Sequence, residues 1–270
     1  MAGQVATASR IDGPLTGSVA MLVADGGRSA LRFVVPTLAL AAVAWTFTAR
    51  MGSGDMSMSV AAFVTGWVVM MVAMMLPAAA PVVGVYALAA RRGVVAAIPV
   101  FIAGYLFVWA LSAAPAYAVS RLIDDPLMQG KPWVSRLVGG TLVVAAAYQL
   151  SPMKAACLRH CRSPMSFFLN RRNSLSRPRT AFAAGAGHGL YCLGCCWALM
   201  AVLITVGGMQ LGWALALAAV ITLEKLGPVA LAASRIIAVA AGGLGVVLLA
   251  RPGVLSHLIV VQMSMSMSSM

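Results

Sequence analysis

The chain has 270 residues, of which 61% are hydrophobic and 9% are charged, and its mean hydropathy is +0.94. Soluble domains carry about 25% charged residues, so this composition excludes an ordinary soluble protein and predicts a polytopic membrane protein. The formal charge of +13 does not indicate nucleic-acid binding, because the basic residues lie in short segments between apolar runs. We therefore expect the lipid bilayer, and no nucleic acid, as the surroundings of the chain.

The two ends of the chain differ in composition from its middle. The first thirty residues mix Gly, Asp, Arg and Thr and lack the apolar core of a signal peptide. We predict a disordered cytoplasmic tail over 1–30, a transmembrane helical domain over 31–252 and a Met-rich tail over 253–270. We find no internal repeat and no soluble domain.

The middle of the chain is divided into apolar runs that are long enough to cross about 30 Å of hydrocarbon. These runs lie near 33–49, 59–89, 95–119, 135–151, 181–206, 210–227 and 229–250. An all-α transmembrane bundle of about seven spans is the simplest prediction. The break at Gly227-Pro228 between the last two runs also allows six.

The basic residues are distributed unequally between the two sides of this bundle. With seven spans, thirteen of the nineteen Lys and Arg lie on the N-terminal side, five lie on the opposite side, and Lys225 lies within a span. Since cytoplasmic loops carry the excess of positive charge, the N-terminus is predicted to be cytoplasmic. The same bias makes the basic segment 151–180 cytoplasmic. The expected location is a bacterial-type inner membrane, crossed several times.

The segment GHGLYCLGCCWALM concentrates metal-ligating side chains within an apolar run. They follow one another at the helical spacing i, i+4, i+7, i+8, which predicts a single stripe near the bilayer midplane. The stripe consists of His188, Cys192, Cys195 and Cys196. Thiolates and imidazoles are ligands for soft or borderline metals, so we predict a metal site here.

Two further groups carry soft ligands. A basic segment contains Cys157, His160 and Cys161 at spacing i, i+3, i+4, and the second apolar run contains two Met-x3-Met pairs. The methionines are Met70, Met71, Met74 and Met75. Because thioethers and thiolates together select Cu(I), we predict a transition metal ion as the ligand, with Cu(I) favoured over Zn(II).

Two adjacent charged residues interrupt the sixth apolar run. Charges within a span are costly and usually face a bundle interior, so Glu224 is expected to face inward and to neutralise a metal ion or carry a coupled proton. Lys225 is expected to extend its ammonium toward the cytoplasmic interface.

Several strings resemble a known family. MMVAMMLPAAAPVV, YQLSPMKAACLRHCRSPMSFFL, GHGLYCLGCCWALMAVLITVGGMQLGW and LEKLGP are similar to the predicted metal-binding integral membrane proteins called domain of unknown function 2182. The resemblance covers roughly residues 59–230 and implies membrane location and metal binding. It implies no reaction.

Together these features predict an integral membrane protein that binds Cu(I) for transport or delivery. The expected partners are a soluble metal chaperone or a membrane metalloenzyme, and the sequence indicates no oligomeric state. No catalytic residues are indicated, and there is no Walker A loop. Two alternatives stay open: a membrane thiol oxidoreductase using Cys192, Cys195 and Cys196, and a non-catalytic assembly factor for a membrane metalloenzyme.

Overall fold

A computed structural model describes most of the chain between the two terminal tails. The described residues are 27–51, 59–90, 94–129, 131–162, 175, 177–206, 211–227, 230–251 and 253. The Met-rich tail predicted after residue 253, and most of the predicted N-terminal tail, lie outside this part of the chain.

Every regular element of the described residues is an α-helix, which confirms the predicted fold class. In chain order the helices are α2 (Gly27–Met51), α3 (Val60–Ala90), α4 (Val94–Met128), α5 (Pro132–Gln149), α6 (Pro152–Arg162), α8 (Pro178–Thr205), α9 (Leu211–Leu226) and α10 (Ala230–Ala250). Several begin at a proline, whose fixed φ suits the first helical position and whose missing N–H has no partner there in any case.

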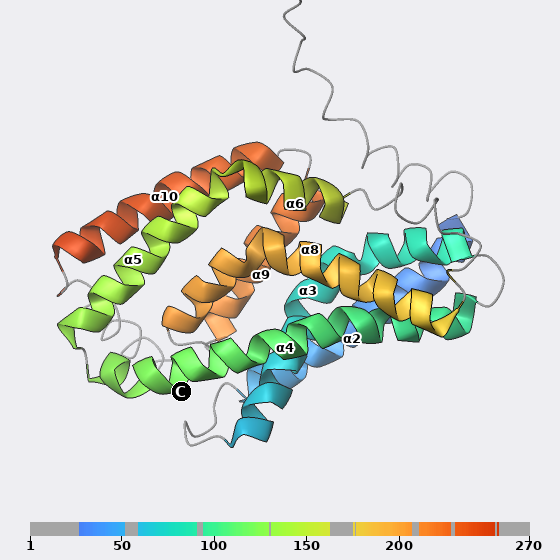
Figure 1. Ribbon diagram of the computed structural model, residues 1–270, viewed down its shortest axis with the longest axis horizontal. Coiled ribbons are helices and arrows are strands. Elements are labelled where there is room, and N and C mark those ends of the chain that lie inside the picture. The colour runs from blue at the N-terminus through green and yellow to red at the C-terminus, as the bar shows by residue number, and fades with distance from the viewer. Residues whose placement is uncertain are drawn as a thin grey trace, which may run out of the picture.

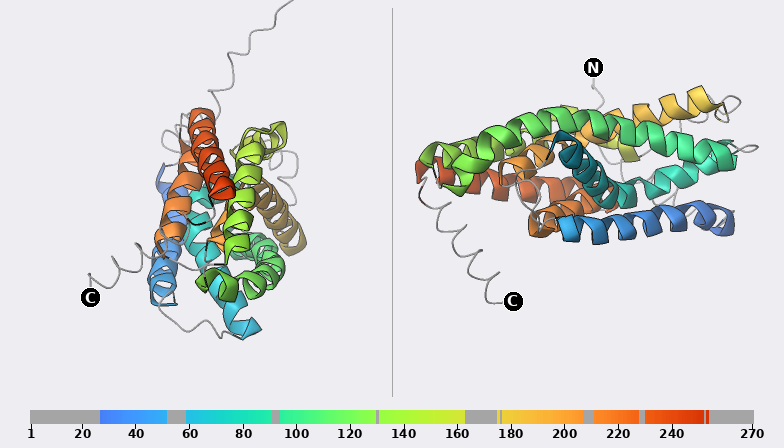
Figure 2. Two further views of the ribbon diagram at one scale, coloured as in Figure 1. Left: turned by 90° about the vertical axis from the view of Figure 1, so that its left-hand side faces the viewer. Right: turned by 90° about the horizontal axis from the view of Figure 1, so that it is seen from below.

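The helices form a bundle that is elongated along α4 and α8, which pack against each other (Figure 1). α2 packs on α3 toward one end, and α10 packs on α5 toward the other end (Figure 2). α9 contacts α3, α10 and α8. α6 lies against α8 and α9, with Leu158 and Cys161 facing the interior of the bundle and the opposite face exposed.

The junction of α5 and α6 places α6 on this interior. Only Leu150 and Ser151 separate the two helices. The Lys154 backbone N–H donates to Ser151 Oγ at 3.2 Å, which makes Ser151 the N-cap of α6, and Pro152 follows at the first helical position. The break therefore ends one helix and starts another within two residues.

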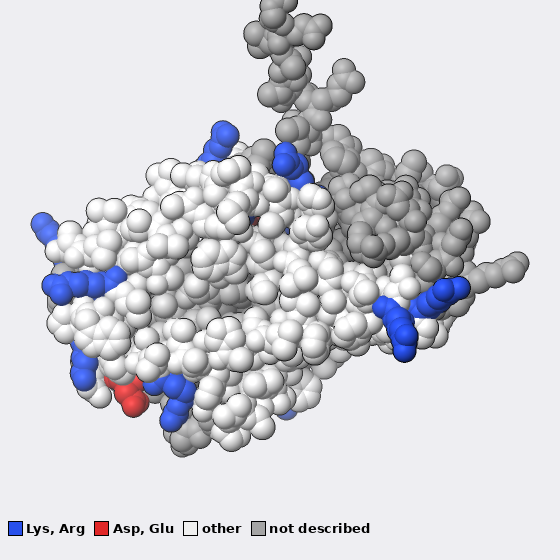
Figure 3. Space-filling model, viewed as in Figure 1, with Lys and Arg blue, Asp and Glu red and all other residues white. Residues whose placement is uncertain are grey.

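Four of the described helices contain stretches that are long and apolar enough to cross a membrane. The stretches are Arg32–Arg50, Val60–Ala87, Val95–Leu127 and Pro178–Thr205, and Ser234–Ala250 is a shorter apolar helix. The predicted count of seven spans stays a prediction. The face in Figure 3 is nearly free of charge, with Lys and Arg toward its edges, and many large apolar side chains of the described helices are exposed, as expected for contact with lipid.

Glycines set the close approach of α4 and α8. A Cβ on Gly185 would lie 1.9 Å from the Phe101 carbonyl oxygen, and a Cβ on Gly104 would lie 2.2 Å from the Phe182 carbonyl oxygen. Helices in lipid associate through van der Waals packing rather than through hydrophobic exclusion, and small residues permit that packing. The contact fixes α8 against α4 and thereby positions the thiols that α8 carries.

Candidate metal centre

The predicted stripe of α8 lies inside the bundle. His188, Cys192, Cys195 and Cys196 are all buried. The thiols of Cys195 and Cys196 donate to the Cys192 carbonyl oxygen, at 3.1 Å and 2.8 Å. These bonds to the preceding turn occupy two thiol protons and leave the sulfur lone pairs available.

The structure joins two clusters that the sequence presents separately. Cys161 of α6 is buried in the same core as the α8 cysteines, and its thiol interacts with the side chains of Cys192 and Cys195. Leu158, one turn earlier on α6, is also in this core. Thiols from two helices therefore lie in one buried core.

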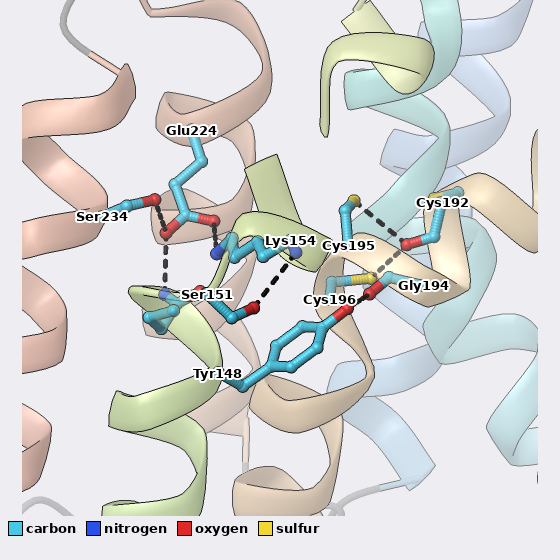
Figure 4. A network of polar contacts seen from close by, with 10 residues as sticks. Tyr148, Ser151, Lys154, Cys192, Gly194, Cys195, Cys196, Glu224 and Ser234 are labelled. Carbon is cyan, nitrogen blue, oxygen red and sulfur yellow. Dashed lines mark hydrogen bonds and ion pairs between the residues drawn. The ribbon is translucent and has the colours of Figure 1, made fainter. Parts of the chain in front are cut away.

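Cys157 lies at the edge of this group. Its Sγ would be 3.0 Å from a Cβ built on Gly194, so the glycine lets α6 rest against the middle of α8. Tyr148 donates its hydroxyl to the Gly194 carbonyl oxygen beside this contact (Figure 4). Partial burial raises the pKa of the Cys157 thiol, and a thiolate at Cys195 would raise it further. Cys157 thus connects the buried thiols with the half-exposed surface of α6.

The two predicted histidines both stack on aromatic rings. His160 is exposed and stacks on Tyr191, with 4.7 Å between the ring centroids. His188 is buried but stacks against Phe101 and Tyr105 of α4, with centroid distances of 6.4 Å and 5.7 Å. His160 Nδ1 also hydrogen-bonds to the Ala156 carbonyl oxygen at 2.9 Å, and His188 has Cys192 and Cys195 as electrostatic neighbours.

Cys192 has the Lys225 ammonium as a neighbour, although Lys225 is expected from the sequence to extend to the cytoplasmic interface. The Lys225 ammonium of α9 donates to Cys192 Sγ at 2.8 Å, and the Tyr105 hydroxyl lies 3.0 Å from the same sulfur. Lys225 is buried, so the expectation that its ammonium extends to the membrane interface is wrong. Because the Cys192 sulfur accepts a hydrogen bond inside the bundle, the Lys225 ammonium can be buried without reaching water.

Glu224 is buried, as expected, and it forms an ion pair with a lysine other than the adjacent Lys225. Lys154 of α6 donates to Glu224 Oε2 at 2.6 Å. Gln149 and Ser234 both donate to Glu224 Oε1 at 2.8 Å (Figure 4). The amide oxygen of Gln149 is buried and has no hydrogen-bond partner among the described residues. The carboxylate therefore connects α5, α6 and α10 to α9.

The predicted methionines lie in the core that contains the thiols. The four side chains are fully buried in one cluster with Cys161, Cys192, Cys195 and Cys196. They are Met70, Met71, Met74 and Met75. Both Met pairs are enclosed because α3 is covered on most sides by other helices. Thioether and thiolate ligands are thus brought into one apolar environment.

The arrangement of donors limits the kind of metal that this core suits. Within the described ranges, no group of three or more His, Cys, Asp or Glu side chains is placed to hold a metal ion. Structural Zn(II) sites almost always take four such ligands. The donors that the core does contain are thiols and thioethers, which are the ligands that Cu(I) accepts.

Several contacts of the candidate site residues could not be predicted from the sequence. Lys154, Tyr105 and Ser234 are not among the predicted site residues, although each bonds to one of them. A charged residue three positions after the end of an apolar run, as Lys154 is, gives no signal of burial. Only the interior charge of Glu224 indicates that a buried cation must exist.

These features define a helical bundle with membrane-length apolar helices and a buried core of thiols and thioethers. Over residues 64–248 the sequence matches the family described as PpoB2, copper chaperone, and the chain belongs to this family. The match supports copper as the metal concerned; the designation domain of unknown function 2182 stays a resemblance. No curated protein and no solved structure matches the chain.

Proposed function

We propose that the protein is a membrane-embedded copper chaperone that binds Cu(I) in its helical core and delivers it to a partner. The observation that carries this proposal is the meeting of Cys161 from α6 with Cys192 and Cys195 from α8 in an apolar core. Thiolates are ligands for Cu(I). Membership of a copper chaperone family supports copper as the cargo.

The proposed ligands have different roles. Two of the thiols Cys161, Cys192 and Cys195 would hold the ion, and Cys196 would serve as a reserve ligand on the same turn. The four α3 methionines would form a weaker relay site in the same core. Cys157, half-exposed on α6, would exchange the ion with a soluble chaperone or a membrane metalloenzyme.

This route needs no chemical reaction and no nucleotide. A thiolate on the partner can displace one protein thiolate at a time, so the ion is never released as a free cation. The buried Glu224 is already paired with Lys154, so its proposed role is to hold α6 in place rather than to ligate copper.

The test is Cu(I) binding by the full-length protein purified in detergent. Cys161→Ser and Cys192→Ser should each weaken binding by more than about a hundredfold, beyond the usual effect of an outer-shell change. His160→Asn is the matched control on α6, because that exposed ring packs on Tyr191 outside the thiol group, and its Cu(I) affinity should equal that of the wild type. Full binding by both serine variants would exclude these thiols as ligands.

A readout of thiol oxidation separates this proposal from the oxidoreductase alternative. A carrier should keep its thiols reduced or metal-bound in cells. Mass spectrometry after acid quenching that finds a substantial disulfide between Cys192 and Cys161 or Cys195 would support redox chemistry instead.

A further inference from the structure

Among the described residues, the buried Lys and Glu side chains are three, and two of them form an ion pair. Lys154 and Glu224 are 1% and 2% exposed and form an ion pair. Lys225 is 4% exposed, and no carboxylate of the described residues pairs with it. Its ammonium instead donates to Cys192 Sγ at 2.8 Å. Within the described part of the interior, the ammonium of Lys225 is therefore the positive charge that lies outside the ion pair.

The direction of the neighbouring side chains explains this separation. Successive residues of a helix point about 100° apart, so Glu224 and Lys225 face different neighbours. Glu224 faces α6 and α10, while Lys225 faces α8. The carboxylate of Glu224, which is adjacent to Lys225 in the sequence, thus pairs with Lys154 instead.

A buried charge is costly unless an opposite charge lies beside it. The sulfur of Cys192 is the group placed to supply that opposite charge, because it accepts from the ammonium directly. One thiolate balances the charge of Lys225, so a second thiolate is needed for charge balance only when a metal cation binds. The charge of the protein interior therefore constrains the charge of the cargo.

We propose that Lys225 is a specificity determinant that makes the thiol core selective for monovalent soft cations. This inference rests on the proposed function. Two thiolates and one Cu(I) leave a single negative charge, which the Lys225 ammonium cancels. Two thiolates and a divalent cation are already neutral, so the ammonium would remain uncompensated in an apolar core. The lysine acts without ligating the metal.

The size of the effect follows from the electrostatics of a low-dielectric interior. Removing a fixed charge at contact distance from the ligand should change the preference for monovalent over divalent cations by on the order of a hundredfold or more. Softness of the ligands alone would not produce this change, since the thiols and thioethers stay the same. Ag(I) and Cd(II) are suitable probes because both are thiophilic, do not change oxidation state and differ in charge.

The experiment measures Ag(I), Cu(I) and Cd(II) affinities of the full-length protein in detergent by competition with chelators. Lys225→Met should lower the ratio of Ag(I) to Cd(II) affinity by about a hundredfold or more, chiefly by weakening Ag(I) and strengthening Cd(II). Lys225→Arg should keep the wild-type ratio, because it keeps the charge. Arg235→Met, which removes an exposed positive charge on α10, is the control and should also leave the ratio unchanged.

The outcomes distinguish this inference from the proposed function. If the wild type binds Cu(I) through Cys192 but Lys225→Met keeps the wild-type ratio, the specificity role is overturned and the chaperone proposal stands. If the wild type binds no Cu(I), the chaperone proposal fails first. Should Lys225→Met not fold, Lys225→Gln gives the same comparison with a donor retained beside Cys192. Equal affinity of the wild type for Ag(I) and Cd(II) would overturn the inference without any variant.

Discussion

At the scale of single residues, Cys192 is the point where four helices meet. Its sulfur accepts from Lys225 of α9, lies 3.0 Å from the Tyr105 hydroxyl of α4 and interacts with Cys161 of α6. Its backbone carbonyl accepts the thiols of the following turn. If Cys192 is a metal ligand, as we propose, these polar neighbours orient it before any metal arrives, which reduces the ordering cost of binding.

Gly194 gives a residue-scale test of how α6 rests on α8. Gly194→Ala would place a methyl group 3.0 Å from Cys157 Sγ, so we expect α6 to shift by a few tenths of an ångström and Cys157 to react faster with maleimide. Gly187→Ala is the matched control, because a Cβ there meets nothing within 4 Å; it should stabilise α8 by about 0.5–1 kcal/mol. Equal thermal stability and equal Cys157 labelling in the two variants would contradict this packing.

At the scale of helices, α6 is a short helix of eleven residues that carries two of the proposed ligands. It is held on the bundle by the Lys154–Glu224 ion pair and by Arg162, whose guanidinium donates to the Gly227 carbonyl oxygen at 3.0 Å. The short break at Leu150 and Ser151 separates it from α5.

The ion pair predicts how α6 depends on Glu224. Glu224→Gln leaves the Lys154 ammonium buried without a counter-charge, so it should destabilise the protein by about 3–5 kcal/mol and expose Cys161 to thiol reagents. Adding Lys154→Met should recover much of the stability. Unfolding in detergent and the labelling rate of Cys161 check both effects.

The control for this change is Asp125→Asn, which neutralises an exposed carboxylate on α4 and should have little effect. If Glu224→Gln were as stable as the wild type and kept Cys161 protected, the ion pair would not be what holds α6 in place.

At the scale of the whole molecule, the unequal distribution of basic residues predicts the orientation in the membrane. We expect the segment 151–180 to face the cytoplasm. A Cys introduced at Ser174 should therefore resist an impermeant maleimide in intact cells and react after lysis. Rapid labelling in intact cells would reverse the assignment of the two sides.

Much of the fold could be predicted from the sequence, because apolar length and helical spacing are local properties. The stripe of His188 and the α8 cysteines is buried as its spacing predicts. The meeting of Cys161 with Cys192 could not be predicted, since it depends on how α6 turns back onto α8. The partner of Lys225 was missed for the same reason: hydropathy records that a charge is buried, and only tertiary packing decides which group compensates it.

The glycine contacts between α4 and α8 also bear on how relatives of this chain can diverge. Gly104 and Gly185 each face a backbone carbonyl of the other helix, so neither position tolerates a methyl group without moving a whole helix. A compensating change in a neighbouring side chain cannot relieve a clash with backbone. In an alignment of the family, these two columns should therefore stay glycine even where surrounding apolar residues exchange freely, and a chain that lost one of them would have to lose the close helix pair as a unit.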